Sequence, residues 1–436
     1  MNKMMRGLAG LAVAVTLLAG CSDPGAETTT SESVDWPAQD ADLSGTTLTI
    51  WAAQNSNKIP DSVVAGFEEL TGAEVEVETI PDPYEQSVQT KVATGDKPDL
   101  AFWQPTASQL TALNAKTNLL PLDDAPFLDS YSSDLRDITG ILDGTRYATL
   151  ISTPAVEGVY YNKEVFADAG ISDLPTDWAS FVELGRELDG KGITPFYEMA
   201  GDRWATQWWV QVQLAEAAKD GLWDRVNANE EKFTDATIQG AIDTYKGLID
   251  DGLFNEDIKT ATFEDQGAAL LAGDAAMVIQ VNSFFSQLQT LAETDELNQK
   301  IGFFPISAEG NIGTFIPDQS NALVAFKTGD ADKEAAARQL LSYWMGDGYE
   351  DFVNAEATVS LQDGVATPAD VPDALLAVSD SLADSAGSMQ ALAIANPDLY
   401  IFLADMIQGT KSTKDVATAT QDQFAELAKA QGADGF

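Results

Sequence analysis

Three short runs near the start of the chain decide the fold: TTLTIW at residues 46–51, AEVEVETI at 73–80 and DLAFW at 99–103. The first and third have the apolar character of buried strands, and the second alternates apolar and acidic residues as a strand does. The segments between them have helical spacing, one beginning at 60–61 and the other covering 84–94. This β-α-β-α-β order predicts an α/β domain with a largely parallel sheet.

The rest of the chain predicts a second set of similar elements. Further strand-like runs occur at 156–161, 275–281, 301–305 and 321–326. Two pairs have capping-box spacing, in which an acid follows a Ser or Thr by three residues at the start of a helix: Thr262 with Asp265, and Ser412 with Asp415. With 436 residues the chain is too long for one ordinary core, so two domains are expected.

The composition excludes several classes of function. The chain has 24 Lys and Arg against 69 Asp and Glu, and this net charge of −45 repels nucleic acid. It has no histidine, so a Ser-His-Asp unit or a His-ligated metal is impossible. One cysteine forms neither an internal disulfide nor a thiolate cluster. We therefore expect no cofactor, no metal and no nucleic-acid partner, while nine tryptophans indicate a packed globular protein.

The N-terminus predicts export. Lys3 and Arg6 precede an apolar run at 8–18, which is too short to span a bilayer, so residues 1–20 are interpreted as a signal peptide. The run ends in LAGC at 18–21, which resembles the lipobox of bacterial lipoproteins, and this resemblance implies a lipid on Cys21. The alternative is an ordinary cleaved signal with a chance cysteine.

The segment after Cys21 has the composition of a flexible tether. Residues 22–43 are rich in Ser, Thr, Asp, Glu and Pro and bury too little apolar surface to fold. Loss of Lys3 and Arg6 with the signal would take the charge from −45 to −47. The prediction is a protein anchored by lipid to the outer face of a bacterial cell membrane.

The chain resembles the extracellular solute-binding proteins of bacterial ABC importers, in the sugar-binding group that includes the maltose-binding proteins. The resemblance covers residues 46–436 and is carried by eight segments in order: LTIWAAQNS at 48–56, FEELTGAEVEV at 67–77, VATGDKPDLAFWQP at 92–105, VYYNKEVFADAGISDLPTDWASF at 159–181, LAGDAAMVIQVNS at 271–283, IGFFPIS at 301–307, ADKEAAARQLLSYWM at 331–345 and GTKSTKDVATATQDQFAELAKAQG at 409–432.

This resemblance implies a periplasmic-binding-protein fold, which has two α/β lobes, a hinge and a ligand cleft between the lobes. Lobe 1 would hold residues 44–153 and 300–347, and lobe 2 would hold 154–299 and 348–436. In this family the lobes close around the ligand, and the closed form is recognised by the transmembrane subunits of the permease. The implied partners are a carbohydrate and that permease, and the protein is expected to be a monomer.

Candidate sugar-binding residues follow from the chemistry of a pyranose, which has apolar faces and a hydroxyl rim and therefore needs aromatic rings with polar groups beside them. Trp51 ends a predicted strand and is followed by Gln54 and Asn55, and Trp103 is followed by Gln104. Ligands of open α/β sheets gather at the carboxyl ends of strands. Ordinary core packing of the two tryptophans is the alternative.

Further candidates come from lobe 2. By resemblance, Asp202, Arg203 and Trp204 form a ligand-contacting turn, and Trp208 lies one helical turn further on the same face. The family places a stacking tryptophan near residue 283, where this chain has serine.

Two neighbouring phenylalanines and one acid complete the candidates. Either Phe284 or Phe285 takes over the stacking role, with the other packing in the core, or this subsite differs in shape from that of the family. Asp318, which precedes a strand, would reach the cleft from lobe 1, with a plain loop as the alternative.

Three functions compete. The first is capture of a neutral carbohydrate without any catalysis. The second is a surface glycoside hydrolase lipoprotein with paired carboxylates, although no tract singles out one acid and one nucleophile. The third is a binding protein for another solute, such as a polyol or a peptide. The resemblance favours the first.

Overall fold

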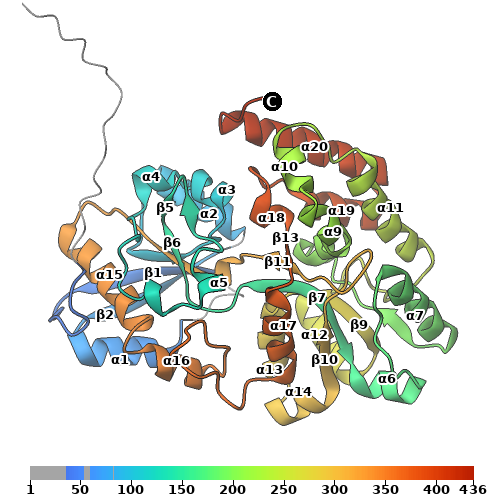
Figure 1. The fold of residues 1–436 in the computed structure, drawn as a ribbon, viewed down its shortest axis with the longest axis horizontal. Helices are drawn as coiled ribbons and strands as arrows, with labels where there is room; N and C mark the ends of the chain where they lie inside the picture. Colours follow the sequence, from blue (N-terminus) through green and yellow to red (C-terminus); the bar gives the residue numbers. More distant parts are fainter. Residues whose placement is uncertain (1–35, 54–58, 82) are drawn as a thin grey trace, which may run out of the picture. The chain divides into compact units, whose positions relative to one another are not determined.

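The computed structural model describes residues 36–53, 59–81 and 83–436. Residues from Trp36 to Phe436 form one compact unit built on two larger β-sheets and a short hairpin (Figure 1). The predicted signal peptide, Cys21, Gln54 and Asn55 lie outside the described residues. Among the helices described, none combines the length and the apolar character needed to cross a membrane.

The first sheet has the strand order β2-β1-β3-β12-β6. Its strands are β1 (Thr47–Ala53), β2 (Glu74–Ile80), β3 (Leu100–Phe102), β6 (Ala148–Leu150) and β12 (Ala322–Ala325). Strand β1 pairs in parallel with β2 and β3, while β12 runs antiparallel to β3 and β6. The helices α1 (Asp61–Thr71) and α2 (Tyr84–Ala93) connect the parallel strands, so the predicted β-α-β-α-β order is confirmed.

The other elements around the first sheet are short, apart from one long helix. They are α3 (Ala107–Ala112), α4 (Ala115–Asn118), η1 (Leu128–Ser130), α5 (Ser133–Arg136), the hairpin β4 (Ile141–Leu142) and β5 (Thr145–Arg146), η4 (Gln319–Asn321), α15 (Ala331–Trp344) and α16 (Tyr349–Ala355). Apolar residues of α1 and α15, among them Phe67 and Leu341, pack with β1 in one core on this sheet. We call the first sheet and these elements the first lobe.

The second sheet has the strand order β13-β11-β7-β9-β8, with β10 also paired to β7. Its strands are β7 (Ala155–Asn162), β8 (Thr194–Phe196), β9 (Ala275–Gln280), β10 (Ile301–Phe304), β11 (Thr314–Ile316) and β13 (Ala386–Gly387). Strand β7 is central and buried along most of its length. The second lobe is this sheet with its own helices, and its core is rich in aromatic rings around Trp209.

The second lobe carries most of the helices. They are α6 (Lys163–Ala169), α7 (Trp178–Gly190), η2 (Trp204–Gln207), α8 (Trp208–Gln211), η3 (Val212–Leu214), α9 (Ala215–Lys219), α10 (Leu222–Asn227), α11 (Ala236–Asp250), α12 (Phe263–Ala272), α13 (Ser283–Gln289), α14 (Thr294–Lys300), α17 (Asp373–Leu382), α18 (Met389–Leu392), α19 (Leu399–Gln408) and α20 (Thr413–Ala430).

The strand pairing corrects the predicted lobe boundaries at 300 and 347. Strands β10 and β11 both pair with β7, so the chain stays with the second sheet until Ile316. It then returns to the first sheet at Ala322. Helix α16 and Leu361 pack in the core of the first lobe, so the last crossing falls after Leu361.

The end of the predicted tether is docked rather than flexible. We call residues 36–43 the strap. The Trp36 ring contacts Phe127 edge-on, with 5.8 Å between ring centroids. The Gln339 side-chain amide donates to the carbonyls of Gln39 and Ala41 at 3.1 and 2.8 Å. The Gln39 side chain accepts from the amide of Asp347 at 3.1 Å, so the strap is bound to the first lobe.

Replacing Trp36 with alanine is expected to lower the free energy of unfolding by about 1–2 kcal/mol, because it removes a partly buried ring from the first lobe. Cleavage within residues 36–43 by a protease should become faster. Thermal melts and limited proteolysis measure the two effects, and Trp36→Phe, which keeps an aromatic ring, is the control. If W36A and W36F are cleaved at the same rate as the unaltered chain, the strap is not held by this ring.

Candidate functional site

The two strand-end tryptophans of the first lobe lie in its core. Trp51 is 1% exposed, and its indole nitrogen donates to Glu78 at 2.9 Å. The Lys91 ammonium lies over its ring, 4.7 Å from the centroid. Trp103 is fully buried and donates to the carbonyl of Gln109. These placements favour the core-packing alternative, so we do not retain a stacking role for either ring.

The aromatic candidates of the second lobe differ from one another in exposure. Phe284 and Phe285 are both buried, and Phe284 packs against Tyr160 with centroids 5.4 Å apart. Both rings belong to the core between β7, β9 and α13, which favours packing for each of them, and the stacking role of one stays a prediction. Trp208 is also buried, whereas Trp204 is partly exposed.

Asp202, Arg203 and Trp204 form an exposed turn, as the sequence predicted for this segment. The Asp202 carboxylate accepts from the amide of Phe263 at 2.7 Å, at the start of α12. Trp204 packs on the Phe263 ring at 5.2 Å. Arg203 has a φ of 69°, which is unusual for a residue with a side chain. Such strain is characteristic of functional turns, and this turn remains a candidate.

Asp318 has a local structural role. Its carboxylate accepts from the backbone amide and the hydroxyl of Ser320 at 2.8 and 2.9 Å. Burial raises its pKa above the ordinary value. Because both bonds lie within one turn before β12, this placement favours the plain-loop alternative.

A glutamate that the sequence did not predict is the most unusual group in the second lobe. Glu157 lies in the middle of β7 and is fully buried. Neither of its carboxylate oxygens has a hydrogen-bond partner among the described residues, and burial raises its pKa well above the ordinary value. The residue directly opposite it on β11 is Thr314, whose hydroxyl likewise lacks a partner in the described chain. Unpaired buried polar groups cost several kcal/mol, so a functional reason is expected.

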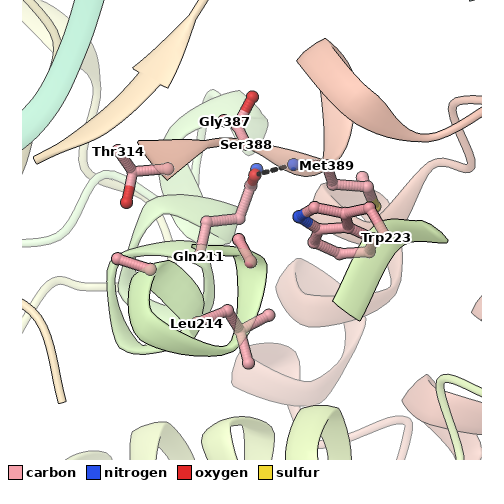
Figure 2. Close-up of a pocket in the computed structure, with 9 residues that line it drawn as sticks. Gln211, Leu214, Trp223, Thr314, Gly387, Ser388 and Met389 are labelled. Carbon is pink, nitrogen blue, oxygen red and sulfur yellow. Dashed lines mark hydrogen bonds between the residues drawn. The ribbon is translucent and has the colours of Figure 1, made fainter. Parts of the chain in front are cut away.

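Gln211 lines the same cavity as Thr314. The side-chain oxygen of Gln211 accepts from the backbone amide of Met389 at 3.0 Å. The side-chain nitrogen of Gln211 has no partner in the part of the chain that is described. Gln211, Thr314 and Met389 line one small cavity (Figure 2). That cavity is narrower than a water molecule, so a ligand needs a more open arrangement to enter.

A hydrogen-bonded chain runs from Gln390, which follows the cavity-lining Met389 in sequence, to Trp204 at the exposed turn. Gln390 donates to Gln207 at 2.8 Å, and Gln207 donates to the carbonyl of Trp204 at 3.1 Å. The side-chain oxygen of Gln390 is buried and has no partner within the described ranges. The partly exposed Trp204 and the unpaired polar atoms on α18 are thus parts of one network.

The first lobe meets this network through α3, which contacts α18. Gln104, a predicted candidate at the end of β3, and Gln109 on α3 each have a buried side-chain oxygen that is unpaired among the residues described. Tyr400 on α19 lies within electrostatic reach of Glu85 on α2 of the first lobe. Burial first, and then the charges of Asp398 and Glu85, raise the pKa of Tyr400 to about 12.

The arrangement suits a ligand with many hydroxyl groups. We call Glu157, Thr314, Gln211, Gln390 and Gln104 the polar set: each has a buried side-chain atom without a hydrogen-bond partner among the described residues, and the first four lie in the second lobe while Gln104 lies in the first. The carbonyl of the partly exposed Trp204 is linked to Gln390 of this set through Gln207. Within residues 36–53, 59–81 and 83–436, no three His, Cys, Asp or Glu side chains come together in a way that could hold a metal ion.

The sequence of this chain matches one family model and several known proteins. The sequence model of the family described as bacterial extracellular solute-binding protein matches residues 52–351. The alpha-glucosides-binding periplasmic protein AglE of Rhizobium meliloti is 31% identical over 248 residues, which is 53% of this chain and 51% of AglE. The chain therefore matches only about half the length of that relative.

Two further similarities cover more of the chain. The diacetylchitobiose binding protein DasA of Streptomyces coelicolor is 24% identical over 364 residues, which is 79% of this chain and 77% of DasA. The solved structure of a chitin oligosaccharide binding protein superposes with a TM-score of 0.73 at 21% identity. It covers 88% of this chain and 99% of that structure, which shows that the two-lobe fold is shared.

Proposed function

The chain belongs to the bacterial extracellular solute-binding protein family, and from this we propose that it captures a sugar or oligosaccharide between its lobes and delivers it to an ABC permease. The observation that carries the proposal is Glu157, a fully buried carboxyl group without a partner among the described residues. A protein tolerates such a group where a ligand supplies the missing hydrogen bonds.

A sugar fits the polar set for a chemical reason. Each hydroxyl group donates one hydrogen bond and accepts others, so it suits both the oxygens of Glu157 and the nitrogen of Gln211. The partly exposed ring of Trp204 provides an apolar surface for a pyranose face. The names of AglE, DasA and the chitin oligosaccharide binding protein also refer to carbohydrates.

The remaining parts of the proposal concern place and mechanism. The protein acts on the outer face of the bacterial cell membrane, held there by a lipid on Cys21. It binds without catalysis, closes by rotation of its lobes and presents the closed form to the permease. A neutral sugar is favoured over an anionic solute, because a net charge of −45 repels anions at long range.

Isothermal titration with a panel of neutral mono- and oligosaccharides tests this function. We expect at least one sugar to bind with a micromolar or lower Kd and with a negative heat-capacity change, since binding buries Trp204. A parallel assay with nitrophenyl glycosides should show no turnover. Failure of every sugar would overturn the proposal, and binding of a polyol or peptide in the same assay would identify the other class of solute. Hydrolysis that depends on one carboxylate would indicate a glycosidase.

A further inference from the structure

Two of the chain crossings between the lobes run side by side and are bonded to each other. The first crossing is residues 151–154, between β6 and β7, and the second is residues 317–321, between β11 and β12. The amide of Ile151 donates to the carbonyl of Asn321 at 2.8 Å. The Asn321 side chain donates to the hydroxyl of Ser152 at 3.0 Å and to the carbonyl of Thr153 at 2.9 Å. Asn321 directly precedes β12, so these bonds fasten the first crossing to the first lobe.

The second lobe holds the same crossing through another asparagine, Asn282, which follows β9. Its side-chain oxygen accepts from the amide of Val156 at 3.0 Å, within the second sheet. Its nitrogen lies 3.4 Å from the carbonyl oxygens of both Thr153 and Pro154. The Thr153 carbonyl is therefore shared by one asparagine from each lobe, with a short bond to the first lobe and a long one to the second. Long hydrogen bonds are the weaker ones.

Two prolines restrict where the crossings can rotate. Ala155 and Ile316 are paired directly across β7 and β11. Pro154 precedes the first of them and Pro317 follows the second. A proline fixes its own φ and holds the residue before it in extended backbone. Next to the Ala155–Ile316 pair, the backbone torsions that stay free to change are the ψ angles of Pro154 and Pro317. A rotation between the lobes therefore concentrates at these two angles.

We propose that the Ala155–Ile316 pair, flanked by Pro154 and Pro317, is the pivot of lobe rotation, and that the Asn282 side-chain nitrogen is the contact released on opening. This rests on the proposed function. The strand pairing also links the pivot to the ligand, because Glu157 and Thr314 are the directly opposed residues two positions further along the same two strands. A sugar bound at Glu157 and Thr314 lies beside the pivot. Its hydrogen bonds to these residues therefore influence the rotation of the lobes directly.

The substitution Asn282→Asp tests the releasable contact. It keeps the oxygen that accepts from Val156 and removes the nitrogen that reaches Thr153 and Pro154. The matched control is Asn354→Asp on α16, whose nitrogen donates to the carbonyl of Glu350 on an exposed face away from both crossings. Distances are measured by pulsed spin-label spectroscopy in the full, ligand-free chain carrying Cys21→Ser. The labels are placed at Glu69→Cys on α1 and Asp189→Cys on α7.

We expect N282D to increase the ratio of long to short label distances at least threefold, with a melting temperature within about 3 °C of the parent chain, and N354D to leave the ratio unchanged. A distribution for N282D that matches N354D overturns the proposal. If N282D fails to fold, the double variant Pro154→Ala and Pro317→Ala must broaden the distribution, and an unchanged one overturns the pivot. Because no ligand is added, these results stand apart from the sugar titration, whose failure overturns the proposed function instead.

Discussion

Replacing Glu157 with alanine is expected to weaken binding of the sugar identified by titration at least 30-fold. The raised pKa of Glu157 favours its neutral form, and removing its side chain leaves the sugar hydroxyls that bond to its two oxygens unpaired, at a cost of about 1–3 kcal/mol. The loss is then about 2–3 kcal/mol, and every 1.4 kcal/mol is a factor of ten in Kd. Calorimetric titration of the variant measures it directly.

The same variant is expected to be more stable than the parent chain without ligand. Removing an unpaired buried carboxyl group removes its desolvation cost, so affinity and stability should change in opposite directions. Glu157→Gln keeps the shape and should lose less affinity than E157A. The exposed Glu183 on α7 provides the control, and E183Q should change neither quantity. An affinity of E157A within twofold of the parent would remove Glu157 from the site.

A second large effect is expected for Glu198, in the form of a dependence of stability on pH. Glu198 is 1% exposed, and its carboxylate accepts from the amide of Met199 at 2.7 Å and from the hydroxyl of Tyr245 at 2.8 Å. No ion pair includes it in the part of the chain described. Burial, which outweighs these two bonds, raises the pKa of Glu198 from 4.5 to about 7.

The direction of the effect follows from that shift. Between pH 4.5 and about 7 the folded chain keeps the proton on Glu198, while the unfolded chain releases it. The contribution of Glu198 to the free energy of unfolding is complete below pH 4.5, and it is lost as the pH rises through about 7. One pKa unit corresponds to about 1.4 kcal/mol, so the loss is about 3 kcal/mol. Urea unfolding of the parent chain and of Glu198→Gln at pH 5, 6, 7 and 8 measures it. We expect the difference between the two to grow with pH, and parallel curves would contradict the assignment.

Much of the fold follows from local sequence signals. Helix α2 covers Tyr84–Ala93 where a helix over 84–94 was predicted, because apolar spacing is a property of neighbouring residues. Both predicted capping boxes form, with the hydroxyls of Thr262 and Ser412 accepting from the amides of Asp265 and Asp415. The lobe boundaries failed for the opposite reason. Strand pairing joins residues distant in sequence, and nothing within 301–304 indicates that its partner is β7.

The site was less predictable, because a tryptophan at a strand end has the same local sequence whether it faces a ligand or the core. Trp51 and Trp103 show this, since both are buried. The more informative signal was a single acid in an apolar strand. In AVEGVYYN at 155–162, Glu157 is the one charged residue, whereas Glu74, Glu76 and Glu78 alternate along an exposed edge strand. A lone acid in a central strand cannot be placed on a solvated face, and its partner must come from elsewhere.

The docked strap has a consequence for the proposed anchor at Cys21. Because residues 36–43 are bound to the first lobe, the stretch between the proposed anchor and that lobe shortens from residues 22–43 to residues 22–35. A flexible chain of about 14 residues has a root-mean-square length of about 20 Å, against about 26 Å for the 22 residues up to position 43. Since the accessible volume scales with the cube of that length, docking would roughly halve the volume open to a chain anchored as proposed and about double its local concentration at the membrane.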